Sequence, residues 1–386
     1  MSITNHERPG VYSQYDASTV ISSTGGGQNV GLAALYDGDE EVEGLYTFSR
    51  YEDAATAFGE ATITELVRLL FLNGAAQVKA VPVADAESYE DAFALLEAEE
   101  DIAVVVCDSD TLTVQQALRD SVNTASANRR ERIAVVRGKT AETVSNLVTQ
   151  AQSLNSERMV LVAPLGGDAG AAVAAAVAGA IAAESDPAVP LGGAELKGVG
   201  ALQAQYSDTE IDTLVRGGVT PVESVAGVVS VVRGVTTRTK TGEAADATWR
   251  ELTTIRIVDD VIPTVRNALK ARFRRAKNTE QSRGAIRSQV VVELENKLAR
   301  EIITGYENVT VTADTENPTV CLVDFAFTVA HGLNQIWLSA HITVYGGRAG
   351  VVAPHRGQDS APCIIREEER HESRGISHQQ RHLSGD

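Results

Sequence analysis

The 386-residue sequence is poor in cysteine and in aromatic residues. Its three cysteines, Cys107, Cys321 and Cys363, lie far apart and form no CxxC pair. This spacing argues against a disulfide framework and favours a reducing compartment or free buried thiols. Aromatic residues make up only 5% of the chain. We therefore expect a core of tightly packed small residues without large aromatic clusters.

Long apolar runs and an excess of positive charge are missing as well. The longest apolar run, Ala171–Ala183, is too short to cross a bilayer and is predicted to form a buried helix. Met1–Pro9 is polar, so we expect no secretory signal. The formal net charge of −18 would repel nucleic acid and anionic membranes. The composition predicts protein partners, with no nucleic acid and no direct membrane insertion.

Complete catalytic motifs are also missing. Residues 138–140 (Gly-Lys-Thr) follow an expected strand, as in a phosphate-binding loop, but Ile133 stands where that loop needs a glycine. Residues 166–170 do not fit GxGxxG and are interpreted as a turn, and no GxSxG motif occurs. His331 and His341 lack the spacing of metal ligands. We predict no catalytic residue, cofactor or metal, and keep an α/β nucleotide-binding or hydrolytic enzyme as the alternative function.

What the sequence does contain is an alternation of short apolar strands and helices. This pattern predicts a parallel sheet with helices on both faces, a doubly wound α/β domain over residues 84–245. A further strand is expected at 225–240. The expected elements before it are strands at 102–107, 133–136 and 159–163 and helices at 111–128, 140–154, 169–184 and 208–216.

The regions on either side are predicted to fold differently. Residues 25–83 read as a small β-rich domain, and residues 246–332 as an α+β domain that follows a polar joint at 242–246. The first is expected to contain strands at 29–35, 45–48 and 76–83 and helices at 52–58 and from about 62. The second is expected to contain a strand at 251–258, a helix with Pro263 in its first turn, a helix at 284–303 and a strand at 308–313.

Two strand-like runs, 317–329 and 335–344, flank a short turn that contains Gly332 and Asn334. A long strand with an unpaired edge is a template for aggregation unless something covers it. We therefore predict that the second run pairs with another copy of the same protein. Its apolar side chains, which alternate along the run, are Ile336, Leu338, Ala340, Ile342 and Val344.

Both ends of the chain are predicted to extend away from the folded domains. Residues 1–24 are polar and extended, and they form either a frayed terminus or an arm that docks on another molecule. The triglycine 25–27 that follows is interpreted as a flexible joint. Residues 345–386 are rich in His and Arg and lack periodicity, which predicts a disordered tail.

One helix departs from the acidic character of the chain. Between Asp260 and Glu280 there is no acidic residue, and the segment carries six basic ones. Such a strip is either a solvated helix face or a docking surface for an acidic protein partner. Its basic residues are Arg266, Lys270, Arg272, Arg274, Arg275 and Lys277.

Several segments resemble the phage tail sheath family, and they occur in the family's order over about residues 1–344. The resemblance is specific because it involves both ends of the folded chain. The matching segments are Glu7–Tyr12, Tyr51–Gly59, Phe71–Ala75 followed by Val78 and Val81–Val83, Trp249–Asp260, Arg283–Arg287 and Phe327–Ile336.

The resemblance implies a structural role. Sheath subunits of contractile phage tails, bacteriocin-like particles and related injection systems polymerise helically around an inner tube and contract to drive it through a target cell envelope. Their middle domain has a subtilisin-like fold, but this chain lacks the matching Asp, His and Ser, so no protease activity is implied. The implied partners are other copies of the chain, the inner tube protein, and baseplate and tail terminator proteins. The implied location is a virion tail or contractile particle assembled in the host cytoplasm.

The resemblance also assigns roles to particular residues. In the family, an arm at each end adds a strand to a neighbour's sheet, and the C-terminal domain faces the tube. This implies inter-subunit arms at 1–24 and 333–344, and tube binding by the basic strip. The implied arm residues are Val11, Tyr12, Tyr15, Ile336, Trp337, Leu338, His341, Ile342 and Val344. The hinge candidates are Gly25, Gly26, Gly27 and Gly332.

Overall fold

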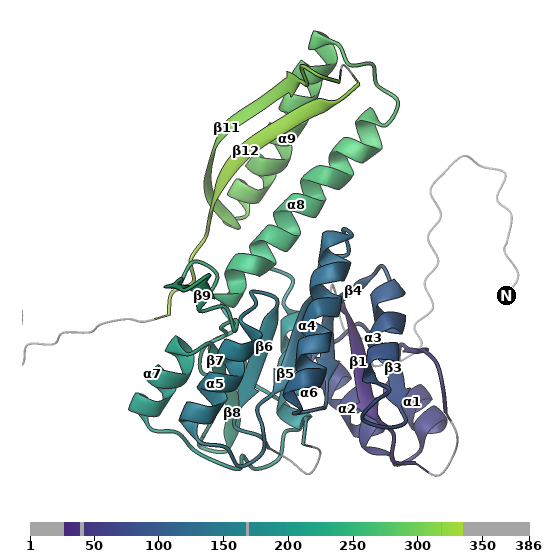
Figure 1. Ribbon diagram of the computed structural model, residues 1–386, viewed down its shortest axis with the longest axis vertical. Helices are drawn as coiled ribbons and strands as arrows, with labels where there is room; N and C mark the ends of the chain where they lie inside the picture. The colour runs from purple at the N-terminus through teal and green to yellow at the C-terminus, as the bar shows by residue number, and fades with distance from the viewer. Residues whose placement is uncertain (1–26, 39–41, 167–169, 318, 335–386) are drawn as a thin grey trace, which may run out of the picture. The chain divides into compact units, whose positions relative to one another are not determined.

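The computed structural model describes residues 27–38, 42–166, 170–317 and 319–334 (Figure 1). Within these residues, eight strands form one sheet in the order β2-β3-β1-β4-β5-β6-β7-β8. The six central strands are parallel, while β2 and β8 pair antiparallel at the two edges. The strands are β1 (Asn29–Leu35), β2 (Tyr46–Phe48), β3 (Gln77–Val83), β4 (Ile102–Cys107), β5 (Ile133–Arg137), β6 (Met159–Ala163), β7 (Val219–Val225) and β8 (Val228–Val231).

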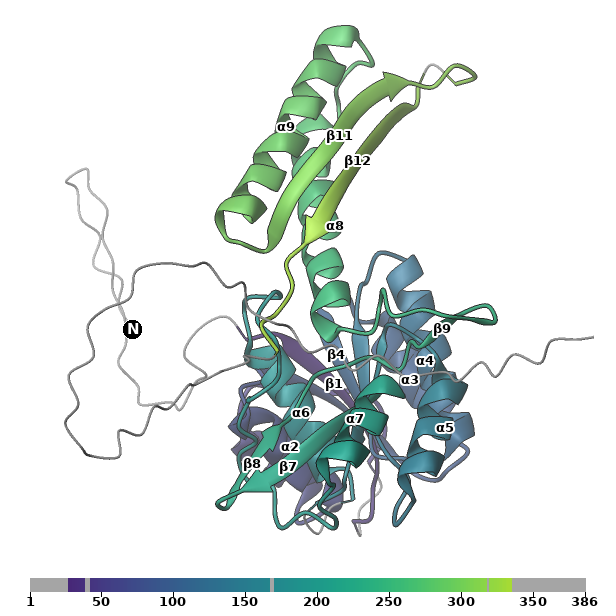
Figure 2. The same cartoon turned by 90° about the vertical axis from the view of Figure 1, so that its left-hand side faces the viewer.

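Helices cover both faces of this sheet, as the alternation of strands and helices predicts (Figures 1 and 2). Successive residues of β4 contribute to opposite cores: Val104 and Val106 to one, Val105 and Cys107 to the other. Helices α1, α2 and α6 pack on the first face, and α3, α4, α5 and α7 on the second. These helices are α1 (Tyr51–Phe58), α2 (Thr62–Leu72), α3 (Tyr89–Ala98), α4 (Leu112–Ala127), α5 (Val144–Leu154), α6 (Ala172–Ala183) and α7 (Asp208–Arg216).

Helix α6 is the buried, Ala-rich helix that the sequence predicts. Almost all of its residues are buried, and its small side chains allow a close approach to α2. A side chain at Gly179 would place its Cβ 2.8 Å from the carbonyl oxygen of Leu70. The low aromatic content is therefore matched by close helix packing in this core.

The N-terminal strands do not form a sheet of their own, contrary to the predicted fold class. Strand β1 pairs in parallel with β3 on one side and with β4 on the other. Because five consecutive residues of β1 are buried, the strand requires cover on both faces and neighbours on both edges. Residues 27–83 thus share one sheet with residues 102–231, and the predicted domain boundaries remain predictions.

Two predicted strands are wrong. The expected strand at 225–240 is interrupted near its start by the turn of the β7–β8 hairpin, where Ala226 and Gly227 adopt positive φ. Beyond that turn, β8 is the only part of the expected strand that lies in the eight-stranded sheet. The expected strand at 251–258 lies almost entirely in helix α8 (Leu252–Phe273), so that Pro263 is inside the helix and not in its first turn. Residues 252–257 are buried on every side, which hides the helical periodicity that a half-exposed helix would show.

The C-terminal part packs two long helices against a two-stranded sheet (Figure 2). Val261 and Val265 of α8 meet Val290 and Leu294 of α9 (Glu280–Ala299) in one core. Strands β11 (Ile303–Ala313) and β12 (Cys321–Val329) pair antiparallel and add to this core. The partner of β12 is therefore β11, whereas residues 335–344, the predicted second run of the hairpin, lie outside the described residues.

Candidate functional site

The β11–β12 sheet offers strand edges on which another chain could add a strand. Among the described residues it has only these two strands, so each keeps one unpaired edge. The two register shifts between the strands both insert extra residues in β11, where Asn308 has a φ of 56°. Strand β12 is regular, and its burial alternates residue by residue. The edge of β12 is thus the more uniform template for strand addition.

Side chains on β12 divide cleanly between its two faces. Val323, Phe325 and Phe327 pack against the C-terminal core, while Leu322 is 51% exposed on the opposite face. An exposed large apolar residue on an unpaired strand is consistent with a surface that a further chain covers.

The basic strip divides into residues that are used inside the subunit and residues that are not. The Arg266 guanidinium donates to the Glu131 carboxylate at 2.5 Å, and Arg272 donates to the side chain of Gln289. The other four are exposed at the end of α8 and just after it, and within the described part of the chain their side chains make no hydrogen bond or ion pair. These four are Lys270, Arg274, Arg275 and Lys277.

The base of α8 is fixed to the eight-stranded sheet by buried charges. Arg158, just before β6, donates two hydrogen bonds to Asp259 of α8, at 2.7 and 2.9 Å. Burial raises the pKa of the Asp259 carboxyl, although the Arg158 guanidinium favours its charged form. Burial also opposes ionisation of Glu131, but the hydrogen bond and charge of Arg266, a backbone hydrogen bond and the charge of Arg158 together outweigh it and lower the pKa of that carboxyl.

Another buried charge at the same junction, that of Arg256, caps a helix. The Arg256 guanidinium donates to the carbonyl oxygen of Glu184 at 2.7 Å, just past the C-terminus of α6. Burial lowers the pKa of Arg256. A cavity of about 140 Å³ lies beside Arg256, Asp259 and Glu131. Because its charged groups are engaged in these bonds, the cavity belongs to the attachment of α8 and does not present an unused set of ligands.

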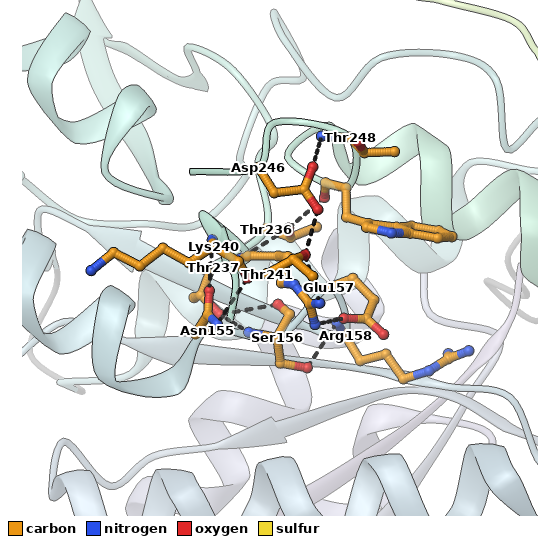
Figure 3. A network of polar contacts seen from close by, with 12 residues as sticks. Asn155, Ser156, Glu157, Arg158, Thr236, Thr237, Lys240, Thr241, Asp246 and Thr248 are labelled. Atoms are coloured by element: carbon orange, nitrogen blue, oxygen red, sulfur yellow. Dashed lines mark hydrogen bonds and ion pairs between the residues drawn. The ribbon is translucent and has the colours of Figure 1, made fainter. Parts of the chain in front are cut away.

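The predicted polar joint before α8 is an ordered structure. Residues 240–246 form a small hairpin of β9 (Lys240–Thr241) and β10 (Ala244–Ala245). Figure 3 shows how Asn155 and Ser156, at the end of α5, bind this segment. The Asn155 side chain accepts hydrogen bonds from the backbone of Thr239 and Lys240 and donates one to the Lys240 carbonyl oxygen.

Side chains within the same network close the hairpin. The Thr241 hydroxyl donates to Asp246 at 2.5 Å, and the backbone N–H of Thr248 donates to the same carboxylate (Figure 3). These hydrogen bonds lower the pKa of Asp246 to about 2. Just before the hairpin, the Thr237 hydroxyl accepts a hydrogen bond from the backbone N–H of Ser156 and donates one to its carbonyl oxygen. The chain therefore enters α8 from a fixed position.

The residues that the sequence singles out as a possible phosphate loop do not form one. Helix α5 begins at Val144, so Thr140 is not at its N-terminus. The Thr140 hydroxyl bonds with Arg137 and Asp110, and Lys139 pairs with Glu142 at 3.5 Å. These side chains bind one another and do not converge on an open anion site.

A buried polar cluster stands at the carboxyl end of β4, where α/β enzymes often bind ligands. The hydroxyl of Tyr89 donates to the Asp108 carboxylate at 2.5 Å, and the backbone N–H of Leu35 donates to its other oxygen at 3.1 Å. Burial raises the pKa of both Asp108 and Tyr89. Both carboxylate oxygens are satisfied from within the fold, which is what a structural cluster requires.

The other described side chains show few features of a reactive site. Among the described residues, no group of three or more His, Cys, Asp or Glu side chains could hold a metal ion. None of the described helices combines the length and apolar character needed to cross a membrane. The thiol of Cys107 is buried, and burial raises its pKa, so it is poorly suited to act as a nucleophile.

The other predicted site residues are only partly within the described residues. All of the predicted arm residues, together with Gly25 and Gly26, lie outside them. Gly27 and Gly332 are described, and both contact other parts of the chain closely. Sequence reasoning missed the Arg158–Asp259 pair, because its partners lie 101 positions apart and no local pattern joins them.

Comparisons with known proteins agree with one another. The family described as phage tail sheath protein central domain matches residues 83–237, and the family described as phage tail sheath C-terminal domain matches residues 244–343. A tail sheath protein of Bacillus phage SP01 is 28% identical over 254 residues, which make up 62% of this chain and 43% of that relative. The chain therefore matches less than half the length of that protein.

Solved structures show a similar fold. A chain of the anti-feeding prophage baseplate has a TM-score of 0.67 and 16% identity, covering 88% of this chain and 100% of that one. The helical sheath of the anti-feeding prophage in its contracted state has a TM-score of 0.63 and 15% identity, covering 86% of this chain and 98% of that one. A sheath tail protein from Desulfitobacterium hafniense has a TM-score of 0.63 and 10% identity, covering 83% of this chain and 100% of that one. At these identities the likeness concerns the fold.

Proposed function

The chain belongs to the contractile phage tail sheath family, and from this premise we propose that it is a structural subunit that polymerises helically around an inner tube. In this proposal the polymer contracts and drives the tube through a target cell envelope. The observation that carries it is the match of the family's central and C-terminal domains, in order, over residues 83–237 and 244–343. The fold shared with a contracted helical sheath supports it.

The setting of this subunit follows from the same proposal. It would act in a virion tail or contractile particle, after assembly in the host cytoplasm. Its partners would be other copies of the chain, the inner tube protein, and baseplate and tail terminator proteins. The role is structural and not catalytic, and the internally satisfied polar clusters near Asp108 and Thr140 are consistent with that role.

Subunits are proposed to be linked by strand addition. The arms at 1–24 and 333–344 would donate strands, and the unpaired edges of the β11–β12 sheet would accept them. The regular edge of β12 supports this, because backbone hydrogen bonds give affinity and alternating side chains give register. A contact between donor arms and a different acceptor surface is heterologous, so it extends into a helix and does not close as a dimer.

The inner tube is proposed to bind the exposed end of the basic strip. Lys270, Arg274, Arg275 and Lys277 are the candidates, because these four are exposed and have no partner in the described residues. Arg266 and Arg272 belong to the earlier prediction but are engaged by Glu131 and Gln289. A tube surface of negative charge would complement the four, and complementary charge guides docking.

Electron microscopy of the purified protein tests the polymerisation. Negative-stain images should show tubes or rings for the full chain, and separate folded particles after deletion of residues 1–20. The circular dichroism spectrum and thermal unfolding of the truncated chain should match those of unassembled full-length protein. Normal tubes from the truncated chain would rule out the N-terminal arm. Compact particles from the full chain at every concentration would favour the alternative, an α/β nucleotide-binding or hydrolytic enzyme.

A further inference from the structure

Gly27 lies where the described chain begins, and its backbone is pressed against the turn after α2. A Cβ atom on Gly27 would lie 2.6 Å from the carbonyl oxygen of Gly74 and 3.3 Å from the nitrogen of Ala76. The next residue is held on both sides: the Gln28 N–H donates to the Ala182 carbonyl at 2.8 Å, and the Gln28 carbonyl accepts from Ala76 at 3.1 Å. Residue 27 therefore occupies a tight, hydrogen-bonded position.

Gly332 makes an equivalent contact shortly after β12. A Cβ atom there would lie 2.8 Å from Cβ and 2.9 Å from Cγ of Pro190. The proline ring cannot rotate away as a flexible side chain would. Two residues earlier, the Ala330 N–H donates to the Ile302 carbonyl at 3.2 Å. The segment that leaves the C-terminal sheet is thus placed against the loop that follows α6.

The hydrogen bond of Gln28, next to Gly27, and the contact of Gly332 both involve one short segment, residues 182–190. Ala182 accepts the hydrogen bond from Gln28, and Pro190 contacts Gly332. The segment is itself fixed, because Asp186 accepts hydrogen bonds from the backbone of Ala188 and Val189. Movement at one of these contacts would have to be accommodated by the segment that carries the other.

Neither glycine is needed for its backbone conformation. The described glycines with positive φ do not include Gly27 or Gly332, so an L-residue could adopt their backbone angles. What both positions require is the absence of a Cβ atom. This differs from the expectation that they are free joints, because a joint needs rotational freedom and not close contact.

We propose that Gly27 and Gly332 are positioning residues that set the direction in which each terminal arm leaves the subunit. Gly27 packs closely on the turn at Gly74–Ala76, which places Gln28 in hydrogen-bonding distance of Ala182, and Gly332 packs on Pro190. This inference rests on the proposed exchange of arms between subunits. With both exits fixed, the arms start from defined points, and less conformational entropy is lost when they pair with a neighbour.

The test adds a side chain at Gly332 and removes the one at Pro190, which it contacts. Gly332→Ala, Pro190→Gly and the double variant are made in the full chain, with Gly284→Ala as control because a Cβ at Gly284 meets nothing within 4 Å. Gly332→Ala should lower the Tm of the unassembled subunit by roughly 2–4 °C. It should also raise the protein concentration needed for polymerisation roughly tenfold. Adding Pro190→Gly should restore much of both losses, since it removes the atoms that clash.

The outcomes distinguish the proposed role of the Gly332–Pro190 contact from the proposed function. If the double variant regains both Tm and polymerisation, the result supports the Gly332–Pro190 contact and its role in directing the arm. Rescue of neither, or a Gly332→Ala variant that behaves like Gly284→Ala, overturns the inference. If the wild-type chain forms no polymer at all, the proposed function fails, while the Tm values of the four variants relative to the wild type still decide whether the close contact exists. Rescue of Tm alone rejects the role in assembly.

Discussion

The eight-stranded sheet and the C-terminal part bury their strands in different ways. The sheet has helices on both faces, and its edge strands β2 and β8 are three and four residues long. The β11–β12 sheet has helices against one face only, and its strands are eleven and nine residues long with unpaired edges within the described residues. Short, covered edges suit a self-sufficient fold, whereas long open edges suit a surface that another chain completes.

Cations inside the sheet region and cations at the end of α8 are held differently. In the sheet region, the buried or half-buried cations are satisfied inside the subunit: Arg132 donates to the Leu96 and Glu99 carbonyl oxygens, and Lys79 pairs with Asp101. At the end of α8, four exposed cations have no partner in the described residues. Within the described residues, the C-terminal part therefore combines unpaired strand edges with four exposed cations, and these are the two features that the proposed contacts with partners would use.

Breaking the attachment between the two regions should have the largest effect on stability. Asp259→Ala leaves Arg158 largely buried without its partner, and such a loss typically costs about 3–5 kcal/mol. Urea unfolding of the unassembled subunit measures this difference. Asp212→Ala is the matched control: it breaks an exposed pair with Arg216 and should cost less than about 1 kcal/mol. Equal values for the two variants would show that the buried pair does not fix α8.

Reversing the exposed charges of the strip should affect assembly but hardly affect folding. Lys270→Glu, Arg274→Glu and Lys277→Glu together should abolish binding of the tube protein in a co-sedimentation assay, whereas the unfolding midpoint should change little. Binding by the wild type should weaken as salt concentration rises, since the proposed contact is electrostatic.

The control for this reversal changes the same total charge elsewhere. Lys139, Arg216 and Lys240 are exposed or largely exposed cations of the sheet region and the segment that follows it, and their triple reversal to Glu should leave tube binding intact. If both triple variants bind the tube as the wild type does at all salt concentrations, the strip is a solvated helix face. If both lose binding, overall charge and not the strip determines the interaction.

Sequence patterns predicted the elements that are regular and locally determined. Strands β4 and β6 and helix α7 have the predicted bounds, because each is a short apolar or amphipathic run with clear ends. The sequence pattern does not indicate helix α3, and it favours a strand at the start of α8. In α8 the residues 252–257 are buried all round, so tertiary packing outweighs the β-branched composition of the segment.

Long-range features could not be predicted from sequence. The second edge of β1 is filled by β4, which begins 67 positions after the end of β1, and nothing local in residues 29–35 indicates that neighbour. Likewise, the strip was visible as six cations, but only the structure separates Arg266 and Arg272, which bind Glu131 and Gln289, from the four that remain exposed. Contacts between residues far apart in the sequence decide which strand lies beside β1 and which cations are paired, and local sequence spacing does not indicate such contacts.

The most direct test of the central claim is the shape of the polymer formed with its tube. Subunits assembled on the inner tube protein and imaged by electron microscopy before and after a destabilising trigger should give two tubular states. The second state should be shorter and wider, with part of the tube exposed. A single diameter under all conditions would indicate a shell that does not contract, and the absence of any tube would contradict the proposed function.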